Sequence, residues 1–93
     1  MSAAQGNKTF EALFDELTFR IASGDPSSRT NELIVQGTHA IGKKIVEEAA
    51  EVWMAAEYQT QEQLAEEISQ LLYHLQVLMH AHQITPAEVY NYL

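Results

Sequence analysis

The chain contains no cysteine, and only two prolines and four glycines among its 93 residues. Without cysteine there is no disulfide, no thiolate metal ligand and no cysteine nucleophile. The sequence also has no apolar run of signal length at its start, and none that approaches the roughly 20 residues of a membrane span. We therefore expect a soluble, cytoplasmic protein with no membrane contact.

Positive charge is scarce as well. The chain has five lysines and arginines and 13 aspartates and glutamates, which gives a formal net charge of -8. No lysine or arginine occurs from Glu51 to Leu93. Nucleic acid is usually bound through a basic surface, which this composition does not supply. We therefore expect no nucleic-acid partner.

The apolar pattern is helical almost throughout the chain. Apolar residues recur at spacings of three and four over about residues 9–22, 30–36, 37–58 and 60–82. The loop signal is SGDPSSRT, at residues 23–30. Near the end, Thr85, Pro86 and Glu88 have the order of an N-cap, a first helical residue and a capping box, which predicts a last short helix. The sequence predicts one all-α domain over residues 1–93, with two long antiparallel helices and shorter ones.

The stretch GKKIVEEAAEVWMAAE, residues 42–57, gathers three acids in five residues: Glu47, Glu48 and Glu51. At 100° per residue, Glu48 and Glu51 border the apolar stripe of their helix, and Glu47 lies slightly farther round. On the next helix, Glu67 and Gln70 border the stripe formed by Leu64, Ile68, Leu71, Leu75, Leu78 and Met79. If the two helices pack antiparallel, Glu48 and Glu51 face Glu67 across a groove.

Carboxylates gathered in this way repel one another, by about 1 kcal/mol per pair at 4 Å even in water. A Mg²⁺ ion offsets that repulsion, because it binds carboxylate oxygens and commonly completes its octahedron with water and substrate phosphates. The common alternative is a solvated, glutamate-rich helix face. The arrangement along two neighbouring helices favours the metal site.

The stretches GKKIVEEAAEV and EEISQLLYHLQVLM together resemble the phosphoribosyl-ATP pyrophosphohydrolases of histidine biosynthesis, which are members of the MazG-like all-α superfamily. The pattern of that superfamily has two adjacent acids, two residues and a third acid, then an acid and an aspartate three apart on the following helix. Glu47, Glu48, Glu51 and Glu67 match the acids. The segments GKK, SRT and LLYHL are more particular to the histidine-pathway branch.

The resemblance implies a MazG-like helical bundle and Mg²⁺-dependent hydrolysis of phosphoribosyl-ATP to phosphoribosyl-AMP and pyrophosphate. It assigns Glu48, Glu51 and Glu67 as Mg²⁺ ligands. Glu47 and Glu48 are the residues expected to act in catalysis, and Glu47 is either a further ligand or the base that deprotonates water. The alternative function is that of a house-cleaning nucleoside triphosphate pyrophosphohydrolase, which would share the same acids.

The chain departs from the family pattern at Gln70, which stands where the aspartate is expected. An amide oxygen can bind Mg²⁺ or accept a hydrogen bond, but it carries no charge and cannot act as a base. We therefore expect Gln70 to be a neutral ligand or to lie just outside the ligand shell.

The basic residues before the acids are candidates for substrate binding. Lys43 and Lys44 lie one turn before the glutamates, where an ammonium can meet phosphate oxygens. Arg29 and Arg20 are weaker candidates, since isolated surface arginines are common. His80, close to the end of its helix, is expected at an exposed position.

The short chain predicts a homodimer. Two helices of about 22 residues, roughly 33 Å long at 1.5 Å per residue, exceed what the shorter helices can cover. Apolar residues also lie on both flanks of the first long helix, with Val46 and Trp53 away from the main stripe. A second copy would complete a four-helix core through a two-fold interface. A helical dimerisation module without metal or activity is the third reading that the sequence leaves open.

Overall fold

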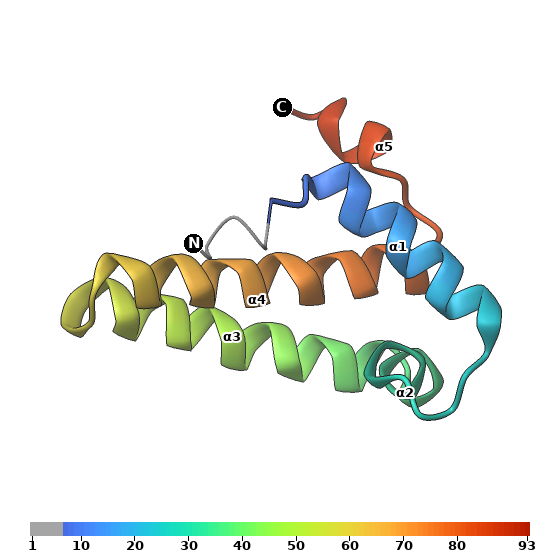
Figure 1. Ribbon diagram of the computed structural model, residues 1–93, viewed down its shortest axis with the longest axis horizontal. Helices are drawn as coiled ribbons and strands as arrows, with labels where there is room; N and C mark the ends of the chain where they lie inside the picture. Colours follow the sequence, from blue (N-terminus) through green and yellow to red (C-terminus); the bar gives the residue numbers. More distant parts are fainter. Residues whose placement is uncertain (1–6) are drawn as a thin grey trace.

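The computed structural model describes residues 7–93, and over that range every regular element is a helix (Figure 1). The helices of the described range are α1 (Phe10–Ser23), α2 (Arg29–Gln36), α3 (Thr38–Tyr58), α4 (Gln61–Ala81) and α5 (Pro86–Tyr90). These bounds agree with the predicted ranges to within a residue or two, so the all-α prediction is confirmed. Residues 1–6 of the expected domain lie outside the described residues.

Side chains close the first turns of four helices. Thr9, Ser28, Thr60 and Thr85 each accept a hydrogen bond from a backbone N–H of the turn that follows. The predicted capping box of Thr85 and Glu88 is present in α5, and Thr60 forms another at the start of α4. Each such cap satisfies an N–H group that has no partner inside the helix, which fixes where the helix begins.

A single glycine joins α2 to α3. Gly37 has φ +95°, and its N–H binds the Leu33 carbonyl at 3.0 Å. Residues with a Cβ rarely adopt such a positive φ, whereas glycine does so without steric cost. The glycine therefore lets the chain turn sharply, so that α2 packs against the start of α3.

The two long helices form an antiparallel hairpin, and the other helices gather at one end of it (Figure 1). α1 lies along the C-terminal half of α4, α2 packs against the start of α3, and α5 lies beside the start of α1. The core sits where these elements meet, and its fully buried residues are Leu17, Leu33, Ile41 and Val77. The other end of the hairpin, the yellow-green turn in Figure 1, extends beyond this core.

The predicted apolar stripe of α4 is only partly buried. Ile68 and Leu75 are exposed, whereas Gln76 is completely buried and its Nε2 donates to the Phe10 carbonyl at 2.8 Å. The expectation that His80 is exposed was wrong, because its ring stacks on Phe14 with centroids 4.0 Å apart. Both differences have the same cause: α1 packs on the flank of α4 that carries Gln76 and His80.

One side of the hairpin exposes several large apolar side chains. Val46 and Trp53 on α3 are 70% and 68% exposed, and Ile68, Leu72 and Leu75 on α4 are also exposed. In two antiparallel helices, the rotation of 100° per residue puts these five residues on one side of the hairpin, away from Glu51. Within residues 7–93 no helix covers this side, which we call the apolar face, except at its edge, where Leu72 shares a cleft with the start of α1.

Candidate active site

Three of the predicted acids converge between the long helices. One carboxylate oxygen from each of Glu48, Glu51 and Glu67 lies within 4.8 Å of the others. Glu48 and Glu51 are neighbours on α3 because they are three residues apart, and Glu67 comes from the facing helix α4. The structure thus brings together the residues that the sequence predicted to face one another. We refer to these three residues as the acid cluster.

Burial and charge in the acid cluster work against ionisation of Glu48. Glu48 is only 9% exposed, whereas Glu51 is exposed and Glu67 is half-buried. Burial raises the pKa of Glu48, and the neighbouring charge of Glu51 raises it further, while the imidazole of His74 opposes the shift. Among residues 7–93, none of the three acids forms an ion pair with a lysine or arginine. A positive charge from outside the chain would therefore stabilise the ionised cluster.

The donor set fits a hard divalent cation. Mg²⁺ binds oxygens at about 2.0–2.1 Å, so its ligand atoms lie within about 4.2 Å of one another, comparable with the spacing of the acid cluster. Carboxylate oxygens from two facing helices can occupy part of an octahedron and leave the remaining positions to water or phosphate. The cluster is accordingly a candidate magnesium centre.

Glu47 lies outside the acid cluster. It is exposed on α3, and Lys44 Nζ lies 3.2 Å from its Oε1. Lys43 is exposed one residue earlier and lines a shallow depression with His39, Gly42 and Val46. Of the two lysines, Lys44 is the one half-buried, and it lies one turn before Glu48 on the helix.

Gln70 and His74 continue the site along α4. Gln70 is exposed one turn after Glu67. Its backbone carbonyl oxygen lies 2.7 Å from Nδ1 of His74. Since a carbonyl only accepts hydrogen bonds, that ring nitrogen carries the proton. His74 is buried and meets the Tyr73 ring edge-on at 4.9 Å. Its position is that of a hydrogen-bonded packing residue beside Glu48.

A cleft of about 570 Å³ opens next to Gln70, between the starts of α1 and α2 and the middle of α4. Its polar lining comes from Lys8, Thr9, Arg29, Ser69, Gln70 and Tyr73. Arg29 is thus near the site, whereas Arg20 pairs with Glu16 on α1 and does not line the cleft. Lys8 was missed because a lysine ahead of a helix N-cap carries no local signal of a site.

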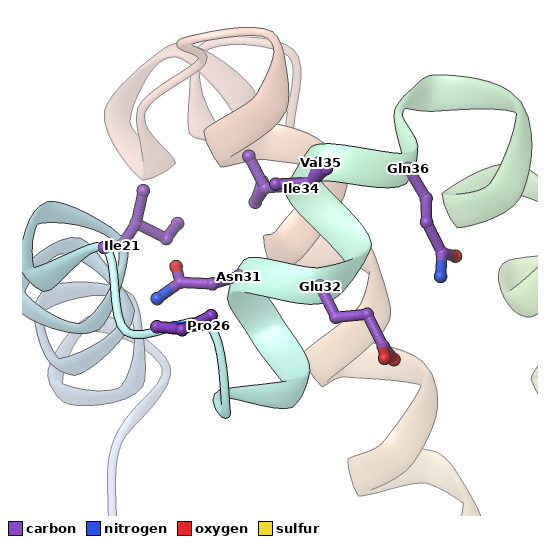
Figure 2. Close-up of a pocket in the computed structure, with 8 residues that line it drawn as sticks. Ile21, Pro26, Asn31, Glu32, Ile34, Val35 and Gln36 are labelled. Atoms are coloured by element: carbon purple, nitrogen blue, oxygen red, sulfur yellow. The ribbon is translucent and has the colours of Figure 1, made fainter.

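A second cavity, of about 450 Å³, lies between the end of α1, the following loop and α2 (Figure 2). Ile21 and Ile34 point into it, while the side chains of Glu32 and Gln36 point away. Its lining is almost entirely apolar, with no ionisable group turned inward among the labelled residues. We therefore place the candidate chemistry at the acid cluster.

Over residues 7–93, five helices with three carboxylates converging between the two longest define an all-α protein with an acidic site in a helical hairpin. Residues 8–93 match the phosphoribosyl-ATP pyrophosphohydrolase family. The phosphoribosyl-ATP pyrophosphatase of Streptomyces avermitilis is 64% identical over 87 residues, covering 92% of this chain and 97% of that protein. The corresponding proteins of Streptomyces coelicolor and Salinibacter ruber are 63% and 55% identical, again over 92% of this chain.

The chain therefore belongs to the phosphoribosyl-ATP pyrophosphohydrolase family, and it is an enzyme of that class. The resemblance seen in the sequence is confirmed. Within residues 7–93, no helix is long and apolar enough to cross a membrane.

Proposed function

We propose that this chain hydrolyses the α,β-phosphoanhydride of phosphoribosyl-ATP in the presence of Mg²⁺, giving phosphoribosyl-AMP and pyrophosphate for histidine biosynthesis in the cytoplasm. The observation that carries the proposal is the convergence of Glu48, Glu51 and Glu67 in a chain of this family. Their three carboxylates can hold the cation that a polyphosphate substrate requires.

When bound by these three residues, Mg²⁺ would neutralise charge that develops on the phosphate oxygens as the anhydride breaks. The protein supplies the remaining groups. Lys44 presents an ammonium one turn before Glu48, where it can donate hydrogen bonds to phosphate oxygens. Lys43, on the exposed flank of the same turn, can add charge at longer range.

Attack on the phosphorus needs a water molecule in line with the leaving group and a group that accepts its proton. Glu47 is the candidate base, because it lies beside the acid cluster in the sequence of α3 but outside the cluster itself. Its contact with Lys44 holds its carboxylate near the proposed phosphate position. Glu48 has the alternative role, since its raised pKa suits proton exchange.

Gln70 lies one turn after Glu67 and can contribute its amide oxygen at the edge of the ligand set. An amide is a weaker ligand for Mg²⁺ than a carboxylate because it adds no negative charge. We therefore propose that the three glutamates alone provide the charge that holds the cation.

Product analysis tests the proposed reaction. The purified chain is incubated with Mg²⁺ and, separately, with phosphoribosyl-ATP, ATP and dUTP, and pyrophosphate release is measured. We expect release from phosphoribosyl-ATP alone, and none from the Glu51→Gln chain. Release from ATP or dUTP in place of phosphoribosyl-ATP would establish the alternative house-cleaning activity instead, and release from none would leave only a helical binding module.

We further propose that the enzyme is a homodimer that buries the apolar face. Trp53 on α3 and Ile68 on α4 are large, exposed and on the same side of the hairpin. Exposed apolar surface of this kind commonly marks an interface. A second hairpin packed against the first would complete a four-helix core and leave the acid clusters on its outer sides.

A further inference from the structure

The cleft beside Gln70 has the lining of a site for a phosphorylated sugar. Lys8 and Arg29 supply two positive groups, and Ser69 and Gln70 supply neutral hydrogen-bonding groups. The rest of its wall is largely apolar, from Phe10, Leu13 and Leu72. Its volume of about 570 Å³ is well above that of a bare phosphate ion and within the range of ligand pockets.

The placement of these bases is notable in so acidic a chain. The chain has only five lysines and arginines for a net charge of -8, and two of the five line this one cleft. Lys43 and Lys44 lie instead on α3, beside the glutamates. Four of the five bases therefore form two separate pairs, one lining the cleft and one on α3 before the glutamates.

Arg29 is held at the cleft by a buried contact. The hydroxyl groups of Thr30 and Tyr73 lie 2.6 Å apart, and Thr30 is 1% exposed. This hydrogen bond joins the first turn of α2 to the middle of α4. It fixes the backbone next to Arg29 relative to Ser69 and Gln70, so the guanidinium starts from a defined position at the mouth of the cleft.

The proposed substrate has two riboses on its purine ring: the ribose of ATP carries the triphosphate, and the second ribose, of the phosphoribosyl group, carries a single 5′-phosphate. We propose that the cleft of Lys8 and Arg29 binds this second phosphate, and that it distinguishes phosphoribosyl-ATP from ordinary nucleoside triphosphates. The inference rests on the proposed function. The triphosphate then lies at the acid cluster, and Gln70 lies between the two subsites.

The two subsites are linked along one helix, α4. Gln70 follows Glu67 by one helical turn, a rise of about 4.5 Å, and Tyr73 follows by another. Ser69 and Gln70 line the cleft, and Gln70 is the one of the two that lies on the side of α4 nearer to Glu67. A ligand anchored at the acids can reach the cleft along this surface of α4.

The bases of the cleft are available to a phosphate. Lys8 Nζ lies 2.6 Å from Glu16, and Arg29 pairs with Glu32 on its own helix. All four side chains are about 37–53% exposed, and exposed ion pairs of this kind contribute little to stability. A phosphate dianion makes stronger, charge-assisted hydrogen bonds, which the fork of an arginine can form in pairs. Exchange of partners is therefore favourable.

Kinetics test the assignment. Lys8→Gln and Arg29→Gln remove one charge each, and Arg20→Gln is the matched control, since Arg20 shares Glu16 with Lys8 but does not line the cleft. We expect KM for phosphoribosyl-ATP to rise about tenfold in each cleft variant, with kcat within twofold of the unchanged chain. That rise corresponds to about 1.4 kcal/mol. The control should keep both constants.

A binding experiment separates this inference from the proposed reaction. Ribose 5-phosphate is titrated into the ¹⁵N-labelled chain without Mg²⁺, with ribose as the uncharged control, and backbone amide shifts are followed. We expect shifts at Ser69, Gln70 and Tyr73 from ribose 5-phosphate only, and a loss of these shifts in the Lys8→Gln, Arg29→Gln double variant.

The two experiments fail in different ways. If the chain binds ribose 5-phosphate in the cleft but does not hydrolyse phosphoribosyl-ATP, the phosphate site is supported and the proposed function is overturned. If both cleft variants hydrolyse phosphoribosyl-ATP with an unchanged KM, and ribose 5-phosphate causes no amide shifts in the cleft, the phosphate site is overturned and the proposed function is supported.

Discussion

Glu48 is the residue at which packing and charge are most opposed. It is buried against the facing helix, yet Glu51 and Glu67 lie beside it and raise its pKa together with burial. A buried carboxylate among other acids lowers stability unless a cation is present. The position is therefore better suited to binding than to holding the fold together.

Magnesium should stabilise the fold through Glu48. A ligand that binds only the native state at 100 times its Kd adds about 2.7 kcal/mol to the free energy of unfolding. We expect millimolar Mg²⁺ to raise the thermal midpoint of the unchanged chain, and Glu48→Gln to remove both this rise and the turnover. Without Mg²⁺ the variant should be at least as stable as the unchanged chain, because it removes charge repulsion.

Glu57→Gln is the matched control for this prediction, since Glu57 is an exposed acid on the same helix and outside the cluster. It should behave as the unchanged chain does. Equal midpoints with and without Mg²⁺, together with an active Glu48→Gln enzyme, would refute the magnesium site.

Gln70 offers a test in the opposite direction. Gln70→Asp restores the charge that the family pattern has at this position, so we expect tighter apparent Mg²⁺ affinity and equal or higher activity. Gln70→Asn is the neutral control of similar length to Asp. Titration of activity against Mg²⁺ measures the difference. An inactive Gln70→Asp enzyme would show that the amide donates a hydrogen bond that a carboxylate cannot make.

At the scale of elements, two polar side chains of α4 fasten it to α1. Gln76 Nε2 donates to the Phe10 carbonyl at 2.8 Å, and His80 Nε2 lies 3.1 Å from the Phe14 carbonyl. The bonded residues are four apart on both helices, so the two contacts repeat at successive turns. This pairing sets how far α1 reaches along the hairpin.

The contact of His80 makes the packing of α1 sensitive to acid. Burial lowers the pKa of His80 below its ordinary value of 6.5, although the bond to the Phe14 carbonyl opposes the shift. The unfolded chain therefore takes up this proton first as the pH falls. The contribution of His80 to stability is complete above pH 6.5 and is lost as the pH falls through the lowered folded-state pKa.

His80→Gln tests this prediction, because the amide can still donate to the Phe14 carbonyl but does not titrate. We expect the thermal midpoint of the unchanged chain to fall more steeply below pH 6.5 than that of the variant. His82→Gln, two residues away at an exposed position without contact to Phe14, is the control for replacing a histidine by glutamine. Equal slopes in all three chains would refute the role of His80.

The helices could be predicted from the sequence because their causes are local. Apolar spacing and capping residues such as Thr85 act within a few residues of the helix they define. The convergence of Glu48, Glu51 and Glu67 also followed, since a short connection makes the long helices antiparallel. The burial of His80 could not be predicted in this way, because it depends on which flank of α4 the distant helix α1 covers.

The same limit applied to the site. Lys8 lies before the first helix, and only the packing of α1 on α4 brings it near Gln70. Glu47 lies outside the acid cluster because it precedes Glu48 by one residue, which turns its side chain by 100° around α3. The sequence pattern predicted only that Glu47 lies slightly farther from the apolar stripe. Whether Glu47 acts as base or ligand stays a prediction.

At the scale of the whole molecule, the apolar face predicts the state of assembly. The chain has a mass of 10.5 kDa, and sedimentation equilibrium at micromolar concentration should give twice that value. Trp53→Glu should shift the equilibrium to monomer, because it puts a charge into the proposed interface. Phe19→Glu is the control, since Phe19 is 77% exposed, somewhat more than Trp53, but lies on α1. A folded, unchanged monomer would contradict the shared core.

The far end of the hairpin has a consequence for motion. Every residue from Ala56 to Gln63 is exposed, and the fully buried core lies at the opposite end (Figure 1). Opening of this end exposes few buried contacts, so its amide hydrogens should exchange with solvent sooner than those of the core. Glu51 and Glu67 lie between the two ends, so an opening that spreads this far along the hairpin would separate them. A second hairpin packed along the apolar face would slow this exchange and keep the three acids at a fixed spacing. Dilution separates the two chains of the proposed dimer, so we expect turnover per chain to fall on dilution even though all three acids belong to one chain.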